Sequence, residues 1–258
     1  SEDRIEALGI HRVAIPIPFR DAGGPVNVYA IENDDRSLTL FDTGYGSEAA
    51  IAALKQGFVD RRLRLESVSR IIVSHGHIDH FCNAQMLAAM TGAPVFMHRG
   101  DIGKVTADPT FAGVVDRSKD FLVLLGVPND AYKSLLDAAR KSEVIPPSVE
   151  SWRVKELDDG DVIRFRDFEA TVLHMPGHTP GLICLHAPVE TLLFSNDHLL
   201  ERVSPNPLLD LSRGSGSTKY RALVEYVASA TRASQIELSA ILPGHGPAFR
   251  GHQSLIAG

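Results

Sequence analysis

The sequence predicts an α+β protein, a four-layer αβ/βα sandwich in which two mixed β-sheets pack face to face with helices outside. Three observations favour this fold class. Short β-branched strands alternate with helical segments in both halves of the 258-residue chain, which is typical of layered sheet-and-helix folds. His and Asp residues follow several strands directly. A helical insertion at about 101–150 interrupts the strand pattern.

The composition is that of an ordinary globular chain, with 44% hydrophobic and 22% charged residues, and supplies a substantial core. The formal net charge is −6 and no basic block occurs, so no nucleic-acid partner is predicted. No apolar run is long enough to span a membrane. We expect a cytoplasmic protein, although a chain that begins at Ser1 is compatible with a removed leader.

The two cysteines, Cys82 and Cys184, are too few for a disulfide framework in a chain of this length. We expect both to behave as small buried hydrophobic residues. The length accommodates one large domain or two small ones, and we interpret residues 1–258 as a single domain that carries the insertion. Its oligomeric state stays open.

Three strands are expected at the start of the chain, at residues 10–17, 26–31 and 37–41. Prolines within and after the first are typical of an edge strand, and the polar connection between the second and third predicts a hairpin. Asp42 ends the third strand, after which residues 47–58 predict a helix whose N-cap is Ser47.

A short apolar strand at 71–73 leads directly into Ser74-His75-Gly76-His77-Ile78-Asp79-His80. A helix at 84–91, closed by Gly92, and a strand at 94–97 are predicted to follow. The histidine-rich segment therefore lies on a loop at the end of a buried strand. Rigid scaffolds often present catalytic groups at such positions.

Residues 101–150 have apolar side chains at helical spacing on both sides of Pro128, which interrupts the pattern. We interpret this segment as a helical insertion that caps the site. A plain structural helix pair on the far side of the molecule is the alternative.

The β pattern returns after Trp152, with strands expected at 154–157, 162–165, 168–173, 182–186, 191–194 and 240–242. A helix is predicted at 220–230. Three of the strand ends in this half carry a potential ligand: His178 lies in a Pro/Gly loop, and Asp197 and His245 each follow a strand.

Four strand-end loops thus carry candidate metal ligands, namely His75, His77, Asp79, His80, His178, Asp197 and His245. Neutral imidazole nitrogen and carboxylate oxygen form the ligand set that zinc and similar cations prefer. A solvated polar loop is the simpler interpretation of any one of these histidines. The alternation of three histidines with an aspartate favours a metal site.

These motifs resemble those of the metallo-β-lactamase fold superfamily of metal-dependent hydrolases. The segment His75-Gly76-His77-Ile78-Asp79-His80 matches the His-x-His-x-Asp-His signature, and the loops around His178, Asp197 and His245 match the later motifs in order. The resemblance implies two divalent metal ions, with zinc expected and iron or manganese as alternatives. It assigns His75, His77 and His178 to the first metal and Asp79, His80 and His245 to the second. Asp197 would bridge the two metals together with a hydroxide.

Asp42 matches an acidic residue early in this fold, and the resemblance implies that it accepts a proton from a ligand histidine and fixes the tautomer of that ring. The implied reaction is attack by the bridging hydroxide on an ester-like bond of a small molecule, most naturally a thioester or a lactone. Asp79 would relay a proton, and His198, beside Asp197, is a candidate for substrate contact. The catalytic assignment is therefore Asp79, Asp197 and His198.

Two other functions stay open. The same metals could hydrolyse a phosphodiester or a phosphonate, or the metal centre could be structural in an interaction protein. Within the superfamily, true β-lactamases usually have Cys or Ser where this chain has Asp197, which disfavours β-lactam hydrolysis. The core resembles glyoxalase II, which adds a C-terminal helical domain, and acyl-homoserine lactonases, which carry a tyrosine where this chain has Leu200.

Overall fold

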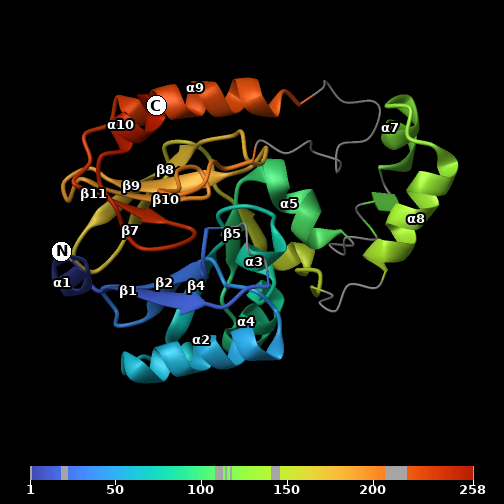
Figure 1. Cartoon of the computed structure of the whole chain (residues 1–258). Coiled ribbons are helices and arrows are strands. Elements are labelled where there is room, and N and C mark those ends of the chain that lie inside the picture. The colour runs from blue at the N-terminus through green and yellow to red at the C-terminus, as the bar shows by residue number, and fades with distance from the viewer. Residues whose placement is uncertain are drawn as a thin grey trace.

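The computed structural model describes residues 2–18, 23–107, 113, 115–116, 118–140, 146–206 and 220–257. Two β-sheets lie between outer helices (Figure 1). The first sheet has six strands, in the order β1 (Ile10–Ile15), β2 (Val26–Glu32), β3 (Leu38–Phe41), β4 (Val68–Ile72), β5 (Val95–Met97) and β6 (Val154–Glu156). Strands β1 to β3 pair antiparallel and β3 to β6 pair parallel, so the sheet is mixed, with β1 at its edge.

The second sheet has five strands, in the order β11 (Ala240–Pro243), β10 (Leu192–Asn196), β9 (Ile183–Ala187), β8 (Glu169–His174) and β7 (Val162–Arg164). Strands β10 and β11 pair in parallel, and the other neighbours pair antiparallel. β6, although it follows the insertion, joins the first sheet beside β5. The chain therefore passes to the second sheet at residues 157–161.

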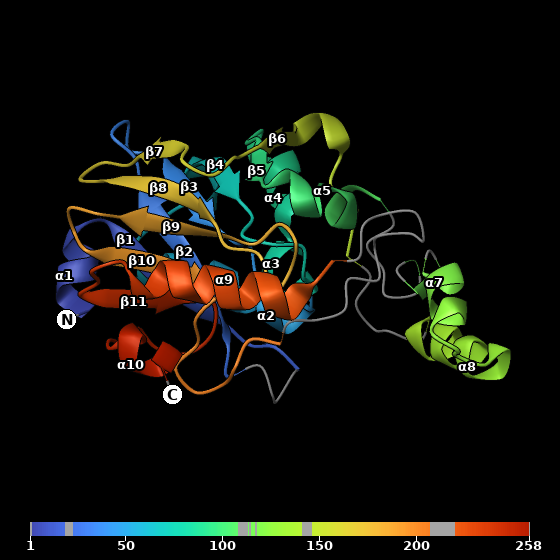
Figure 2. The same cartoon turned by 90° about the horizontal axis from the view of Figure 1, so that it is seen from above.

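Helices cover the outer face of each sheet (Figures 1 and 2). α2 (Glu48–Asp60) and α4 (Ala84–Thr91) pack on the first sheet, whereas α9 (Ala222–Ser234) and α10 (His252–Ala257) pack on the second. The shorter helical segments are α1 (Glu2–Ala7), α3 (Ile78–Phe81), η2 (Leu65–Ser67) and η3 (Ser151–Arg153). The predicted α+β sandwich of two mixed sheets is confirmed.

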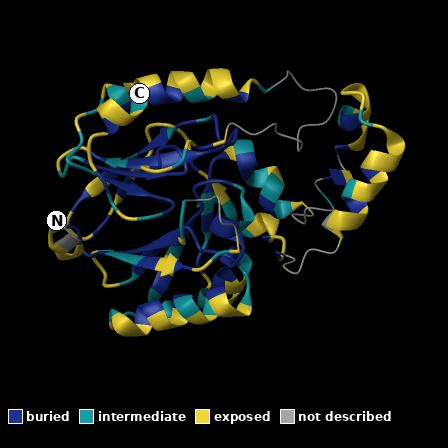
Figure 3. Cartoon of the chain, viewed as in Figure 1, coloured by how far each residue is buried: buried dark blue, intermediate teal, exposed yellow. Residues whose placement is uncertain are grey.

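The space between the sheets is filled by aromatic and branched side chains, and the strands are mostly buried (Figure 3). The ring of Phe194 meets Tyr29 and Phe41 edge to face, with centroids 5.3 and 6.0 Å apart, a geometry that adds to the gain from burial. Two further apolar clusters join each sheet to its helices. Cys82 and Cys184 are buried free thiols.

Two helix ends confirm the expected local chemistry. The Oγ of Ser47 accepts a hydrogen bond from the backbone N–H of Ala50 at 3.2 Å and starts α2. Gly92 ends α4 with φ of 77°, a left-handed conformation that favours glycine. Within the described residues, no helix has the length and hydropathy of a membrane-spanning segment.

The predicted insertion divides into two parts. α5 (Arg99–Thr106) packs on the body of the protein, with Asp101 and Val105 buried. α7 (Lys119–Leu124) and α8 (Asn129–Ala139) share a separate apolar cluster and stand apart from both sheets (Figures 1 and 2). Residues 108–112, 114, 117 and 141–145 of the insertion lie outside the described part of the chain. Whether the insertion caps the site stays a prediction.

Candidate metal centre

The centre lies at one end of the sandwich, where loops from both sheets meet. The loop of residues 74–80 follows β4, the loop of residues 176–181 joins β8 to β9, and residues 197 and 245 follow β10 and β11. The backbone N–H of Ile183 donates to the carbonyl of Ser74 at 3.0 Å, which ties the two sheets together beside these loops. Side chains from distant parts of the sequence are thereby brought to one place.

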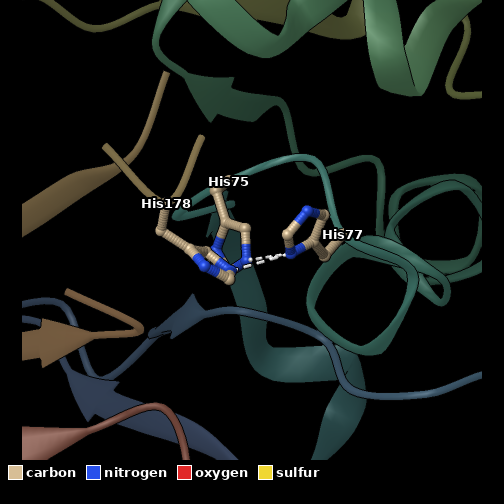
Figure 4. Close-up of side chains that lie close together, drawn as sticks. All are labelled: His75, His77 and His178. Atoms are coloured by element: carbon tan, nitrogen blue, oxygen red, sulfur yellow. Dashed lines mark hydrogen bonds between the residues drawn. The ribbon is translucent and has the colours of Figure 1, made fainter. Parts of the chain in front are cut away.

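Three of the predicted ligands form a first group (Figure 4). Nδ1 of His77 lies 3.1 Å from Nε2 of His75 and 2.9 Å from Nε2 of His178. The three rings meet edge to face, with centroid separations of 4.5 to 5.0 Å. Three imidazole nitrogens therefore converge on one point.

Asp79, His80 and His245 form a second group. Oδ2 of Asp79 lies 3.4 Å from Nε2 of His245 and 3.8 Å from Nε2 of His80. His80 and Asp79 lie on the single turn of α3, which begins at Ile78 because the backbone N–H of His80 and of Phe81 both donate to the carbonyl of His77. This turn points the two side chains to the same side.

Asp197 lies between the two groups. Its Oδ2 is 3.9 Å from Nε2 of His75 and 3.6 Å from Nε2 of His178, both in the first group. The same oxygen is 3.4 Å from Nε2 of His80 and 3.5 Å from Nε2 of His245, in the second group. One carboxylate oxygen thus faces four imidazoles, two from each group.

Asp42 is fully buried and accepts four hydrogen bonds behind the centre. Nδ1 of His80, Nδ2 of Asn196 and the Oγ of Ser74 reach its Oδ2 at 2.7, 2.7 and 2.9 Å. The backbone N–H of Ser74 reaches its Oδ1 at 2.7 Å. Because Asp42 accepts from Nδ1 of His80, it fixes the tautomer of a predicted ligand and leaves Nε2 for the centre.

Ser74 extends this support to the first group. Its hydroxyl donates to Asp42, so the same oxygen accepts from Nδ1 of His75, which lies 2.9 Å away. Nδ1 of His178 likewise meets the carbonyl of Asn206 at 2.9 Å, and Nδ1 of His245 meets the carbonyl of Gly24 at 3.1 Å. Four rings therefore use Nδ1 for support and turn Nε2 toward the centre.

The two groups differ in the protons they hold. Burial, and then the neighbouring His178, lower the pKa of His77 to about 3. Burial, followed by His80 and His77, keeps the pKa of His75 well below its ordinary value. In the second group burial also lowers the pKa values, but Asp197 outweighs it and raises the pKa of His245 to about 9. The pKa of His80 is well above its ordinary value, because Asp197, Asp79 and Asp42 together outweigh burial.

This donor set fits cations. Nε2 of His80 and Oδ1 of Asp197 are buried and have no hydrogen-bond partner among the described residues. Nδ1 of His77 lies within hydrogen-bonding distance of Nε2 of both His75 and His178, yet it can donate at most one hydrogen bond, so at least one of these two Nε2 lone pairs has no donor. Buried polar atoms without a hydrogen-bond partner lower the stability of the fold. A cation coordinated by these nitrogen and carboxylate oxygen atoms would remove this destabilisation.

All seven predicted ligands are therefore brought together, and Asp42 lies directly behind them. His198 is not brought into either group: its ring is buried against Tyr226, with centroids 5.4 Å apart. Its contact with substrate stays a prediction. Ser74 and Asn196, the other partners of Asp42, were not identified from the sequence. No local motif distinguishes them from ordinary polar loop residues.

Known proteins resemble this chain along most of its length. The sequence profile described as the metallo-beta-lactamase superfamily matches residues 21–245. The probable metallo-hydrolase YqjP of Bacillus subtilis is 29% identical over 252 residues, which are 95% of this chain and 74% of that protein. The acyl-coenzyme A thioesterase MBLAC2 of Homo sapiens is 25% identical over 240 residues, 90% of this chain and 76% of that protein.

Among solved structures, a metallo-beta-lactamase family protein from Thermus thermophilus is similar with a TM-score of 0.78 and 24% identity, over 96% of this chain and 77% of that one. A beta-lactamase domain protein from Burkholderia ambifaria has a TM-score of 0.70 and 24% identity, over 96% of this chain and 71% of that one. These similarities concern the fold. Since the family profile covers most of the sequence, the chain belongs to the metallo-beta-lactamase superfamily.

Proposed function

We propose that this protein is a hydrolase that holds two divalent cations, zinc by its donor chemistry, and cleaves thioesters. The observation that carries the proposal is the position of Asp197, whose Oδ2 lies 3.4 to 3.9 Å from one imidazole nitrogen each of four histidines, two from each group. A carboxylate in this position suits a bridge between two cations. His75, His77 and His178 would hold the first cation, and Asp79, His80 and His245 the second.

When bound, two such cations supply an activated water nucleophile and a Lewis acid for the carbonyl oxygen. The residues of the chain contribute orientation and proton transfer. Asp42 holds the ring of His80 directly and that of His75 through Ser74, so both turn Nε2 inward. Asp79, whose side chain is 12% exposed, is proposed to take up the proton of the nucleophile.

Among substrates with an ester-like bond, thioesters are favoured for two reasons. Their carbonyl is electrophilic, and a thiolate leaves with little protonation, so the site requires no strong general acid. The similarity to proteins named acyl-coenzyme A thioesterases is consistent with this choice. Lactones share the electrophilic carbonyl and are the second substrate class to test.

The test compares hydrolysis of an acyl-coenzyme A, a lactone and bis-p-nitrophenyl phosphate by protein reconstituted with zinc, manganese or iron. We expect thioester turnover that disappears in the His178→Ala variant. His11→Ala is the matched control, because His11 lies on β1 and pairs with Glu32 rather than with the centre. A strong preference for the phosphodiester would contradict the thioester assignment.

The non-catalytic alternative is tested with Asp79→Ala. We expect this variant to lose the metal of the second group and, with it, hydrolysis. If the wild-type protein binds metal but hydrolyses none of the three substrates under any reconstitution, the centre is structural and the proposal is wrong.

A further inference from the structure

We infer that Asp101 is a positioning residue for the first metal group, and that its carboxylate holds the loop of residues 74–80 against the loop of residues 176–181. The inference rests on the metal centre of the proposed function. It adds a residue that lies outside both ligand motifs, on α5.

The carboxylate of Asp101 is fully buried and contacts both loops. Its Oδ2 accepts a hydrogen bond from the backbone N–H of Gly76 at 2.9 Å. Its Oδ1 accepts from the backbone N–H of Gly181 at 3.1 Å. Hydrogen bonds to an ionised acceptor are stronger than neutral ones, so one side chain ties together two segments that are far apart in the sequence.

Lys104 keeps this carboxylate paired. Its Nζ lies 3.1 Å from Oδ1 of Asp101, one helical turn away, and its side chain is only 13% exposed. Burial alone would raise the pKa of Asp101, but Lys104 and the N–H of Gly76 more than compensate, and the pKa lies below its ordinary value. The acceptor is therefore charged at neutral pH.

The first turn of α5 also touches the second loop through its backbone. A Cβ built on Gly181 would lie 2.5 Å from the backbone nitrogen of Asp101, and one built on Gly100 would lie 2.7 Å from the carbonyl oxygen of Pro180. Both distances are shorter than side chains tolerate, so these two glycines allow a direct contact between backbones. α5 is thus held in place against this loop.

A stacked pair of histidines reinforces the contact. The ring of His98, whose Nδ1 accepts from the N–H of Gly100 at 3.1 Å, lies parallel to that of His174 with centroids 3.7 Å apart. Nε2 of His174 meets the carbonyl of Pro180 at 2.9 Å. α5 and the loop of residues 176–181 therefore form one packed unit on which the carboxylate of Asp101 is rigidly placed.

The two backbone N–H groups that Asp101 holds lie close in sequence to the histidines of the first group. Gly76 lies between His75 and His77, and Gly181 ends the loop that carries His178, so Asp101 acts on all three members of the first group. The second group is supported elsewhere, because Asp42 holds His80 and the carbonyl of Gly24 meets His245. Loss of Asp101 should therefore weaken the first metal selectively.

The test measures zinc affinity in two backgrounds that each retain one group. His245→Ala disables the second group, and His178→Ala disables the first. Competition with a chromophoric chelator then gives the affinity of the remaining group, with no substrate involved. Asp101→Asn and Asp101→Ala are each introduced into both backgrounds. If the alanine variant fails to fold, the asparagine variant, which has nearly the same shape as the wild-type residue, still tests the inference.

We expect Asp101→Asn to weaken zinc binding by about 10- to 100-fold in the His245→Ala background, the usual effect of losing an outer partner of metal ligands. In the His178→Ala background we expect a change of less than about threefold, since that group has its own support. The matched control is Asp137→Asn on α8, where an exposed aspartate pairs with Arg140 one turn away, and it should leave both affinities unchanged.

Equal losses in both backgrounds would show a general structural effect and overturn the inference, as would unchanged affinities in both. Cobalt absorption provides an independent readout, because a displaced first group changes the visible spectrum of the ion it holds. Absence of hydrolysis by the wild-type protein would refute the proposed function alone. The difference in zinc affinity between the two backgrounds is measured without turnover, so it tests the role of Asp101 independently of the proposed function.

Discussion

Replacement of Asp42 by asparagine removes the charge that supports both metal groups while keeping the shape of the side chain. Asp42 accepts four hydrogen bonds at 2.7 to 2.9 Å, from Ser74, His80 and Asn196. The amide that replaces the carboxylate would supply one acceptor oxygen and one amino group, so at least one buried donor loses its partner.

The size of the effect follows from these contacts. Leaving one partner of a buried ion pair unpaired costs about 3–5 kcal/mol, and in the metal-free protein Asp42 helps to keep the pKa of His80 well above its ordinary value. We therefore expect Asp42→Asn to lower the free energy of unfolding of the metal-free protein by about 3–5 kcal/mol. Zinc affinity should fall by about 10- to 100-fold, because the rings of His80 and His75 lose their orientation.

Urea unfolding of metal-free protein measures the first effect, as a lower midpoint at unchanged slope. Chelator competition measures the second. Asp137→Asn, which replaces an exposed aspartate on α8, is the control and should change neither. If Asp42→Asn binds two zinc ions with wild-type affinity and unfolds within about 1 kcal/mol of wild type, the support assigned to Asp42 is wrong.

Three further predictions concern other parts of the molecule. The metal-free pKa values of His80 and His245 both lie above the ordinary range, that of His245 at about 9, whereas that of His77 is about 3. Zinc must therefore displace protons from His80 and His245 but not from His77, and its affinity for the second group should rise by about 100-fold per pH unit from 7 to 8, about tenfold for each proton released. The affinity is measured in the His178→Ala background, and an affinity that does not change with pH would contradict this assignment of protons. Gly244→Ala would place a Cβ well inside van der Waals contact with Oδ1 of Asp197, so we expect at least about tenfold weaker metal binding by chelator competition; unchanged binding would refute the close contact. Ser47→Ala should destabilise the protein by about 1 kcal/mol in urea, through loss of the α2 cap, without changing metal content.

Much of the fold could be predicted because its local signals agree with the tertiary structure. Strands β2 and β3 are apolar runs around a polar hairpin, and the Ser47 and Gly92 caps mark helix ends that the structure confirms. The sheet to which β6 belongs could not be predicted. Its pairing with β5 is set by contacts across the insertion, and no periodicity within the segment encodes it.

The candidate ligands could be identified because four similar loops follow four strands, and the structure brings their side chains together. Their supporting groups could not be identified in the same way. Ser74, Asn196 and Asp101 are ordinary polar residues in sequence, and each acquires its role from a partner at least 25 positions away. The separation of α5 from α7 and α8 could not be predicted for a related reason, because helical spacing alone does not show which helix packs on the core.

The most direct test of the account is the metal content of the purified protein together with the metal dependence of its thioesterase activity. We predict two bound divalent ions per chain by plasma mass spectrometry, matching the two groups around Asp197. Removal of the metal should abolish thioester hydrolysis, and two equivalents of zinc should restore it. Full hydrolysis by protein that retains no transition metal would contradict the central claim.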